Sequence, residues 1–222
     1  MFNIYCTSWV KNSYLLNDFK YLADKFLGLP IIYDIAPENE KSSTQLKRLV
    51  GSVRDEYIIL LKEDFYFHGK TDLQLLEKLC RYAIENKVDR LGLQSVKDGY
   101  EKNTKYHAEI AGEKIYKLSY TEPYLCSLEA SIWRRNFLDQ HLVLDGSDRD
   151  IEVNMFRHLR GAIRGDMLRS INVLIPENKI FTYSDALING ETRIKLIDGW
   201  FHKLIQAPDG GDLWQNLQIK KE

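Results

Sequence analysis

The chain has 222 residues, with 31 basic and 32 acidic side chains and a formal net charge of −1. This balance argues against nucleic-acid binding driven by counterion release and against a strongly charged membrane-surface protein. Hydrophobic residues make up 44% and aromatic residues 12%, which is a globular composition and excludes disordered, collagen-like and low-complexity classes. The three cysteines, Cys6, Cys80 and Cys126, lie far apart and outside any CxxC or Cys/His cluster, so we expect neither a disulfide framework nor a structural zinc site.

No run of 18 or more apolar residues occurs, and the first residues lack a basic segment followed by an apolar stretch. We therefore expect a soluble, cytoplasmic protein without a transmembrane segment.

The first half of the chain alternates between strand and helix patterns. Strands are predicted over 1–8, 31–35, 57–61 and 89–94. Helices are predicted over 13–27, 43–50 with Ser43 as N-cap, and 72–86. Strands that are apolar throughout predict a mostly parallel sheet with helices on both faces.

Beyond residue 95 the pattern changes. Antiparallel strands are predicted over 108–111, 114–119 and 124–127, helices over 131–142 and 150–160, and a β-prone stretch over 171–183. The fold class predicted for residues 1–222 is a single α/β domain with a smaller antiparallel part.

Two acids follow the predicted strand 57–61. The chain runs from Tyr57-Ile-Ile-Leu-Leu61 through Lys62 into Glu63 and Asp64. Ligands of open α/β sheets bind beyond the carboxyl ends of the strands, so acids there are placed to hold a divalent cation that bridges nucleotide phosphates. A plain polar strand exit is the alternative.

A βαβαβ start with an acidic doublet after a strand resembles the GT-A glycosyltransferases, whose DxD motif binds the metal and diphosphate of a nucleotide sugar. The segment from Tyr124 to Leu138 contains a Ser-Leu-x-x-Ser-x-Trp pattern, and Asp150 and Glu152 then open a helix, as in small polysaccharide-type members. The resemblance covers about residues 1 to 190.

The resemblance implies a Rossmann-like GT-A fold with a nucleotide-binding half (1–95), an acceptor half (96–190) and a C-terminal appendage (191–222). It also implies Mn²⁺ or Mg²⁺, a nucleotide-sugar donor that carries UDP in preference to GDP or dTDP, and a glycan acceptor.

The DxD pattern is only partly kept, because Lys62 stands at the position of its first acid. Asp64 is therefore the preferred metal ligand and Glu63 the second choice. Lys62 either points into the sheet or adds positive charge to the diphosphate, and metal-independent transfer stays open.

Inverting transfer also needs a base that takes the proton of the acceptor hydroxyl. Members of the resembling class carry it near a helix start in the second half, where we favour Glu152, with Asp150 as the alternative. Together with Asp148, these acids also fit a helix start that complements the helix dipole.

Residues at the ends of the first two strands are the candidates for nucleotide contacts. Thr7 and Ser8 face the base and ribose in this hypothesis, Trp9 either stacks on the nucleotide or packs on the sheet edge, and Asp34 either binds ribose or forms a turn before Pro37. Lys47 and Arg48 either contact phosphate or base or are solvated helix charges.

Two further groups concern the acceptor. Trp133 is either a platform for a sugar or a core residue. Arg157, Arg160 and Arg164 recur at helical spacing, which fits a phosphorylated or lipid-linked acceptor, a peripheral membrane contact, or a solvated face.

Other functions remain open at this stage. A nucleotidyltransferase also carries acids at strand ends, but the first loop, Cys6-Thr-Ser-Trp-Val-Lys-Asn-Ser13, lacks the glycines that such an enzyme or a P-loop uses. A non-catalytic, transferase-like domain that binds a glycan or a partner is kept open by Lys62. A serine hydrolase is disfavoured because no GxSxG elbow occurs.

Overall fold

The computed structural model describes residues 3–10, 13–98, 102, 104–120, 122, 125–142, 146–162, 171–181, 183–185, 187–188 and 191–192. Its helices are α1 (Ser13–Phe26), α2 (Ser42–Ser52), α3 (Leu73–Glu85), α4 (Arg135–His141) and α5 (Asp148–Ala162), with a 3₁₀ turn at Val96–Asp98. Most of the predicted appendage, from residue 193 onward, lies outside this part of the chain.

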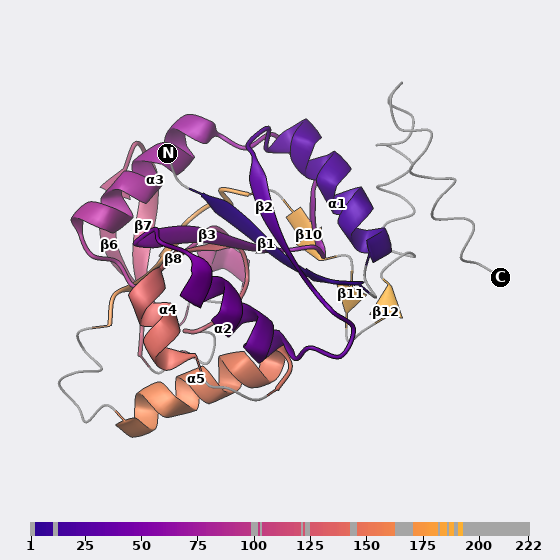
Figure 1. Ribbon diagram of the computed structural model, residues 1–222. Helices are drawn as coiled ribbons and strands as arrows, with labels where there is room; N and C mark the ends of the chain where they lie inside the picture. Colours follow the sequence, from indigo (N-terminus) through magenta and orange to yellow (C-terminus); the bar gives the residue numbers. More distant parts are fainter. Residues whose placement is uncertain are drawn as a thin grey trace.

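A mixed sheet forms the centre of the molecule (Figure 1). Its spatial order is β2 (Ile31–Ala36), β1 (Ile4–Trp9), β3 (Tyr57–Lys62), β8 (Ser131–Arg134), β5 (Arg90–Gly92), β9 (Val173–Pro176), β7 (Glu113–Leu118) and β6 (Thr104–Ile110). The pairings give six of these described strands one direction, and β8 and β7 the opposite one. The predicted fold class, a mostly parallel α/β sheet with a smaller antiparallel part, is confirmed.

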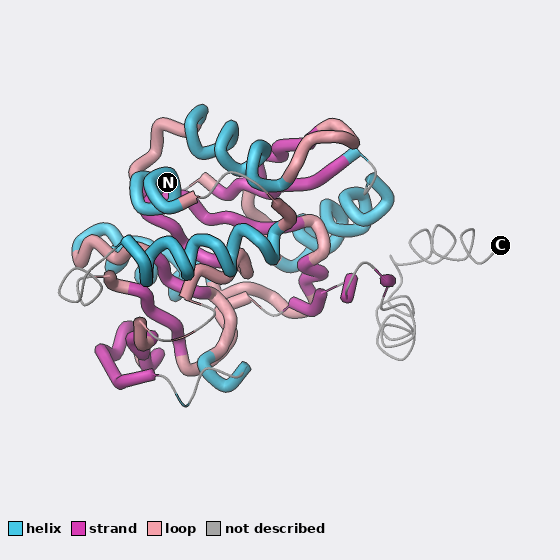
Figure 2. The backbone as a smooth tube through the Cα atoms, turned by 90° about the horizontal axis from the view of Figure 1, so that it is seen from below, coloured by secondary structure: helices cyan, strands magenta, loops and turns pink. Residues whose placement is uncertain are grey.

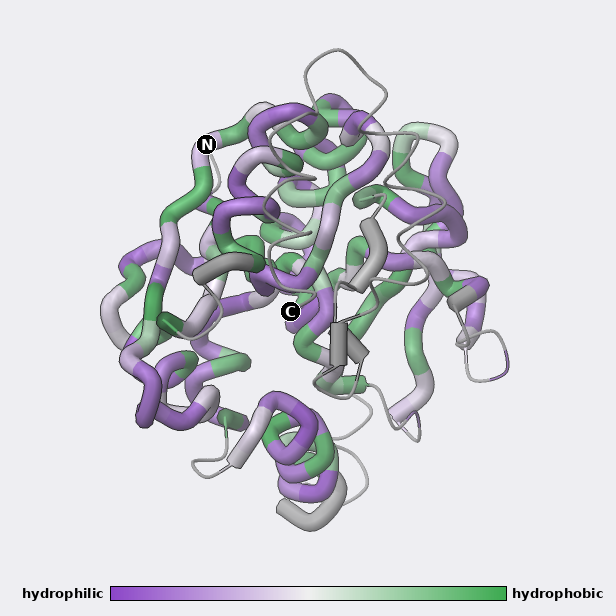
Figure 3. The backbone as a smooth tube through the Cα atoms, turned by 90° about the vertical axis from the view of Figure 1, so that its right-hand side faces the viewer, coloured by the Kyte–Doolittle hydropathy of each residue, from purple (hydrophilic) through white to green (hydrophobic). Residues whose placement is uncertain are grey.

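Helices cover both faces of the sheet (Figure 2). Side chains of α1 and α3, such as Phe19 and Leu79, pack on one face with Ile59 and Leu61 of β3. Side chains of α2, α4 and α5 pack on the other face with Ile58 and Leu60. Successive residues of β3 thus enter opposite cores, as the period of two requires. Figure 3 shows hydrophobic and hydrophilic residues alternating around the turns of the helices.

Small paired strands lie beside the main sheet. They are β4 (Phe65–Phe67) with β10 (Tyr183–Asp185), and β11 (Leu187–Ile188) with β12 (Glu191–Thr192). Strand β4 directly follows Asp64, so the acidic doublet Glu63-Asp64 lies between β3 and β4. No helix in the described part is long and apolar enough to cross a bilayer.

Three local predictions were wrong. The predicted helix 131–142 is split, because its first four residues form β8 in the middle of the sheet and only the rest form α4. Leu125 and Cys126, predicted as part of a strand, lie in a turn. Helix α2 begins one residue early, so Ser43 is buried inside it, and Lys41 occupies the N-cap without a side-chain hydrogen bond.

Candidate functional site

The candidate site lies where β1, β2 and β3 end at their carboxyl edge. Thr7 of β1 is in register with Asp34 on one side and with Lys62 on the other. The parallel pairing therefore brings three of the predicted residues side by side. This is the edge at which open α/β sheets bind their ligands.

Lys62 connects the end of β3 to the start of α5. Its ammonium forms an ion pair with the Asp148 carboxylate, and Asp64 and Glu152 also act on it electrostatically. Burial lowers the pKa of Lys62, but Asp148 and then Asp64 raise it by more, so the pKa lies above its usual value and the side chain is charged. One ammonium thus interacts electrostatically with three carboxylates, of which Asp148 is its ion-pair partner.

Asp64 lies on the Lys62 side of this turn. Its Oδ1 is buried and has no hydrogen-bond partner in the described structure. Burial raises the pKa of Asp64, Lys62 opposes this change, and Asp148 adds to it. A buried carboxylate oxygen without a partner is costly and is suited to an incoming cation or donor.

Glu63 is buried near Cys6. Burial raises the pKa of the Cys6 thiol, and Glu63 is the charge that adds most to this increase. Glu63 and Asp64 form the turn between β3 and β4, and the charges of both raise the pKa of Cys6. Of the two, only Asp64 shares the environment of Lys62 and Asp148.

Glu152 is held on the first turns of α5. Its Oε1 accepts hydrogen bonds from the backbone N–H of Leu128, at 2.6 Å, and from the hydroxyl of Ser127, at 3.3 Å. Burial raises the pKa of Glu152, while the Leu128 N–H and the charges of Lys62 and Arg90 partly lower it. An oriented carboxylate with a raised pKa has the properties of a general base.

Asp150 has a different arrangement. Its Oδ2 accepts hydrogen bonds from the backbone N–H and the hydroxyl of Ser147, at 2.9 and 2.6 Å, and these bonds lower its pKa. The Ser147 hydroxyl in turn lies 3.4 Å from the Asp150 nitrogen, which completes a capping box at the start of α5. At Gly146, where φ is +136°, an added Cβ would collide with Asp150.

The predicted nucleotide contacts divide into two groups. The Ser8 hydroxyl and Asp34 Oδ2 are buried and have no hydrogen-bond partner in the described structure, although Asp34 Oδ1 pairs with Arg48 at 2.5 Å. By contrast, the indole N–H of Trp9 donates to the Glu40 carbonyl at 3.1 Å, and the Lys47 ammonium pairs with Asp139 of α4 at 2.6 Å.

Two charged residues near the site were not selected from the sequence. Asp148 was considered only as a helix-dipole acid, and its partner Lys62 is distant in the chain. Arg90 is fully buried in β5, and its guanidinium lies 5.4 Å from the centre of the Trp133 ring. An arginine directly before the apolar run Leu91-Gly-Leu93 is the one available signal.

Of the two alternatives for Trp133, the core residue is confirmed and the sugar platform is excluded. Its side chain has no exposed surface and packs in the core beneath α4. Arg157 is exposed on α5, whereas Arg164 lies outside the described residues.

The described residues contain no group of three or more His, Cys, Asp and Glu side chains that converge as metal ligands. A magnesium-type ion shared with substrate phosphates needs only one or two carboxylates from the protein. Asp64 Oδ1 fits that requirement, and the excess of carboxylates over ammonium near it favours a cation.

No family model matches the chain, and no curated protein matches its sequence. Among matching solved structures, "Crystal Structure of A197 from STIV" is 12% identical with a TM-score of 0.46, covering 85% of this chain and 87% of that one. Apo-UDP-glucose pyrophosphorylase is 9% identical with a TM-score of 0.45, covering 91% of this chain and 82% of that one. Both TM-scores lie below 0.5, and both identities lie below 25%.

Proposed function

We propose that this protein is a glycosyltransferase that moves a sugar from a nucleoside diphosphate sugar to a hydroxyl of a glycan acceptor, with inversion at the sugar carbon. The observation that carries the proposal is the ion pair between Lys62 and Asp148. It joins the end of β3 to the start of α5, and so brings Asp64 and Glu152 into the surroundings of one ammonium at the ligand-binding edge of the sheet.

The nucleoside part of the donor binds at the ends of β1 and β2 in this proposal. The Ser8 hydroxyl and Asp34 Oδ2 are buried without partners in the described structure, and both are suited to hydroxyl or amide groups of a ribose and base. Thr7, between Asp34 and Lys62, completes this row.

The diphosphate binds next to Lys62 and Asp64. A bound Mn²⁺ or Mg²⁺ would be held by Asp64, with Glu63 as the second candidate, and would supply charge neutralisation for the leaving diphosphate. Lys62 adds a fixed positive charge there, which is stable because its pKa is raised.

Glu152 acts as the base. Its carboxylate takes the proton of the acceptor hydroxyl while that oxygen forms a bond to the sugar carbon, and the bond from this carbon to the diphosphate breaks. The N–H of Leu128 and the hydroxyl of Ser127 hold Oε1, so Oε2 is the oxygen that receives the proton.

The first experiment is a thermal-shift panel of UDP, GDP, dTDP, CMP and ATP, each with and without Mn²⁺. A nucleotide present at about 100 times its Kd stabilises a fold by about 2.7 kcal/mol, which raises the Tm of a chain of this size by about 5 °C or more. We expect such a rise with one diphosphate nucleotide and Mn²⁺, its loss in Asp64→Asn, and its retention in Glu77→Gln, which removes an exposed carboxylate on α3.

The second experiment separates catalysis from binding. Glu152→Gln is expected to keep the thermal shift and to lose release of nucleoside diphosphate from the matching nucleotide sugar. Release of pyrophosphate from a nucleoside triphosphate would instead identify a nucleotidyltransferase. Nucleotide binding without turnover of any donor by the wild type would identify a non-catalytic domain, and no shift with any nucleotide would refute the site.

A further inference from the structure

A basic pocket lies on the hairpin of β6 and β7, in the half of the chain assigned above to the acceptor. Its volume is about 630 Å³, and residues 102, 104–107, 117–120, 125 and 171 supply its walls. Three of the lining side chains are lysines, Lys102, Lys105 and Lys117, and none of the described lining residues is an acid. A chain with a net charge of −1 thus gathers positive charge at one place.

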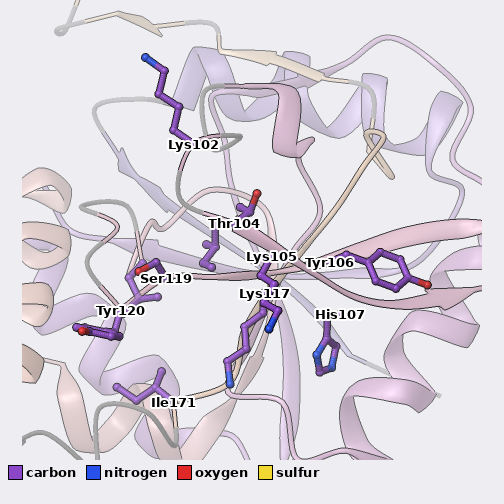
Figure 4. Close-up of a pocket in the computed structure, with 11 residues that line it drawn as sticks. Lys102, Thr104, Lys105, Tyr106, His107, Lys117, Ser119, Tyr120 and Ile171 are labelled. Atoms are coloured by element: carbon purple, nitrogen blue, oxygen red, sulfur yellow. The ribbon is translucent and has the colours of Figure 1, made fainter.

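Lys105 and Lys117 are directly opposite each other in the register of the two strands. Figure 4 shows their side chains next to each other, with His107 beside them. Like charges in such cross-strand positions destabilise a hairpin. Neither lysine forms an ion pair with a described residue, so an anion placed between them would relieve this repulsion.

The pKa of His107 is affected by the same positive charge. Burial lowers its pKa, and the charge of Lys117 lowers it further. Its Nε2 lies 3.1 Å from the Tyr82 hydroxyl, which fixes the ring at the rim of the pocket.

The rest of the lining is suited to a sugar. Leu118, Leu125 and Ile171, which belong to the core under α2, α4 and α5, are buried where they line the pocket, while Tyr106 and Tyr120 are 55% and 46% exposed at its margin. Exposed tyrosine rings offer apolar faces to the C–H groups of a sugar and hydroxyls to its oxygens.

The pocket is connected to the candidate base through one short segment. Leu125 lines the pocket, and the N–H of Leu128, three residues later, donates to Glu152. Three residues span at most about 11 Å. The segment from Leu125 to Leu128 therefore joins the wall of the pocket to the group that holds Glu152.

We propose that the pocket formed by Lys105, Lys117 and His107 binds a phosphate-bearing sugar unit of the acceptor. That this sugar unit belongs to an acceptor rests on the function proposed above. Binding of a sugar phosphate at this hairpin does not depend on that function.

The test is calorimetric titration with glucose 6-phosphate, glucose and inorganic phosphate. We expect saturable binding of glucose 6-phosphate, at least tenfold tighter than inorganic phosphate, and no binding of glucose. The double variant Lys105→Gln/Lys117→Gln is expected to weaken glucose 6-phosphate binding at least tenfold, because it removes two charge-assisted hydrogen bonds. The control Lys70→Gln/Lys78→Gln removes the same charge from exposed positions and is expected to bind as the wild type does.

Three results would overturn the proposal: no binding of glucose 6-phosphate, equal binding by the Lys105/Lys117 variant, or equal affinity for inorganic phosphate alone. The same variant is run through the nucleotide panel and is expected to keep its thermal shift, so failure of this pocket and failure of the nucleotide site are told apart. Its own Tm should equal or exceed that of the wild type, because the substitution removes a like-charge repulsion.

Discussion

Arg90 places a positive charge inside an apolar layer between the sheet and the helices on its second face. Its side chain has no exposed surface, and its three guanidinium nitrogens have no hydrogen-bond partner in the described structure. The Trp133 ring offsets part of the desolvation cost, by about 2 kcal/mol at most, whereas that cost is several kcal/mol. The effect of Arg90 on the site is electrostatic, because its charge lowers the pKa of Glu152.

Arg90→Met is therefore expected to leave the free energy of unfolding unchanged or to raise it, measured by urea denaturation. In a turnover assay, the acid limb of the pH profile should move to higher pH, because Glu152 loses the charge that favours its ionised form. Arg81→Met, on the exposed face of α3, is the control and should move neither quantity. A loss of about 3 kcal/mol or more in Arg90→Met would show that the guanidinium is paired.

At the scale of elements, the start of α5 has two functions that the sequence does not separate. The sequence places Asp148, Asp150 and Glu152 together at one helix start, with Glu152 and then Asp150 as the candidate base. In the structure Asp150 closes the capping box, Asp148 pairs with Lys62, and Glu152 receives the Leu128 N–H. The capping box is local and its Ser-x-x-Asp spacing was visible, whereas the other two contacts depend on where distant segments pack.

Ser147→Ala is expected to lower the free energy of unfolding by about 1 kcal/mol, because the hydroxyl that caps α5 is lost. The measurement is chemical denaturation at neutral pH. Ser52→Ala is the matched control: that hydroxyl donates to the Leu49 carbonyl at the end of α2, where water can replace it, and we expect a smaller effect. An equal loss in both variants would contradict the capping role.

His141 makes the contact between α4 and α5 sensitive to pH. Burial lowers its pKa, and His158 of α5, whose ring centre is 5.9 Å away, lowers it further; Asp89 raises it and Arg134 lowers it. The folded state therefore binds fewer protons here than the unfolded state. The stability that this neutral ring contributes is present above the ordinary histidine pKa of about 6.5 and is lost as the pH falls below it.

We expect the free energy of unfolding to decrease between pH 7.5 and 5.5, and to decrease less in His141→Leu. His158→Leu serves as the comparison, because that ring is exposed and only acts on its neighbour. The quantity to measure is the urea midpoint at several pH values. A steeper decrease in His141→Leu than in the wild type would contradict this assignment.

Across the whole molecule, local patterns predicted the elements better than their arrangement. Periodicity predicts β1, β3, α1 and α3 because the apolar residues of each element follow one regular spacing along its length. The strand β8 was read as a helix because Ile132, Trp133 and Phe137 also fit helical spacing. It is a strand because it inserts between β3 and β5, where Ile132 enters one core and Trp133 the other. Residues that are close in the sequence carry no signal of such an insertion. The same is true of the site, because Lys62 pairs with Asp148 only after the sheet is assembled.

The two cores share this one sheet, so we expect them to unfold together. Leu79 of α3 and Leu159 of α5 are both fully buried, one in each core. Leu79→Ala and Leu159→Ala should each lower the free energy of unfolding by about 2–5 kcal/mol. Both should do so in a single transition, with the same midpoint by tryptophan fluorescence and by circular dichroism.

The double variant should lose the sum of the two within about 0.5 kcal/mol, because the side chains lie on opposite faces and share no contact. Leu73→Ala, a substitution of the same kind at a position that is 41% exposed, should cost much less. If Leu159→Ala instead produced a second transition while Leu79→Ala did not, the face covered by α2, α4 and α5 would be a separate folding unit, and the coupling of Lys62 to Asp148 would then have to be maintained across a boundary between two units.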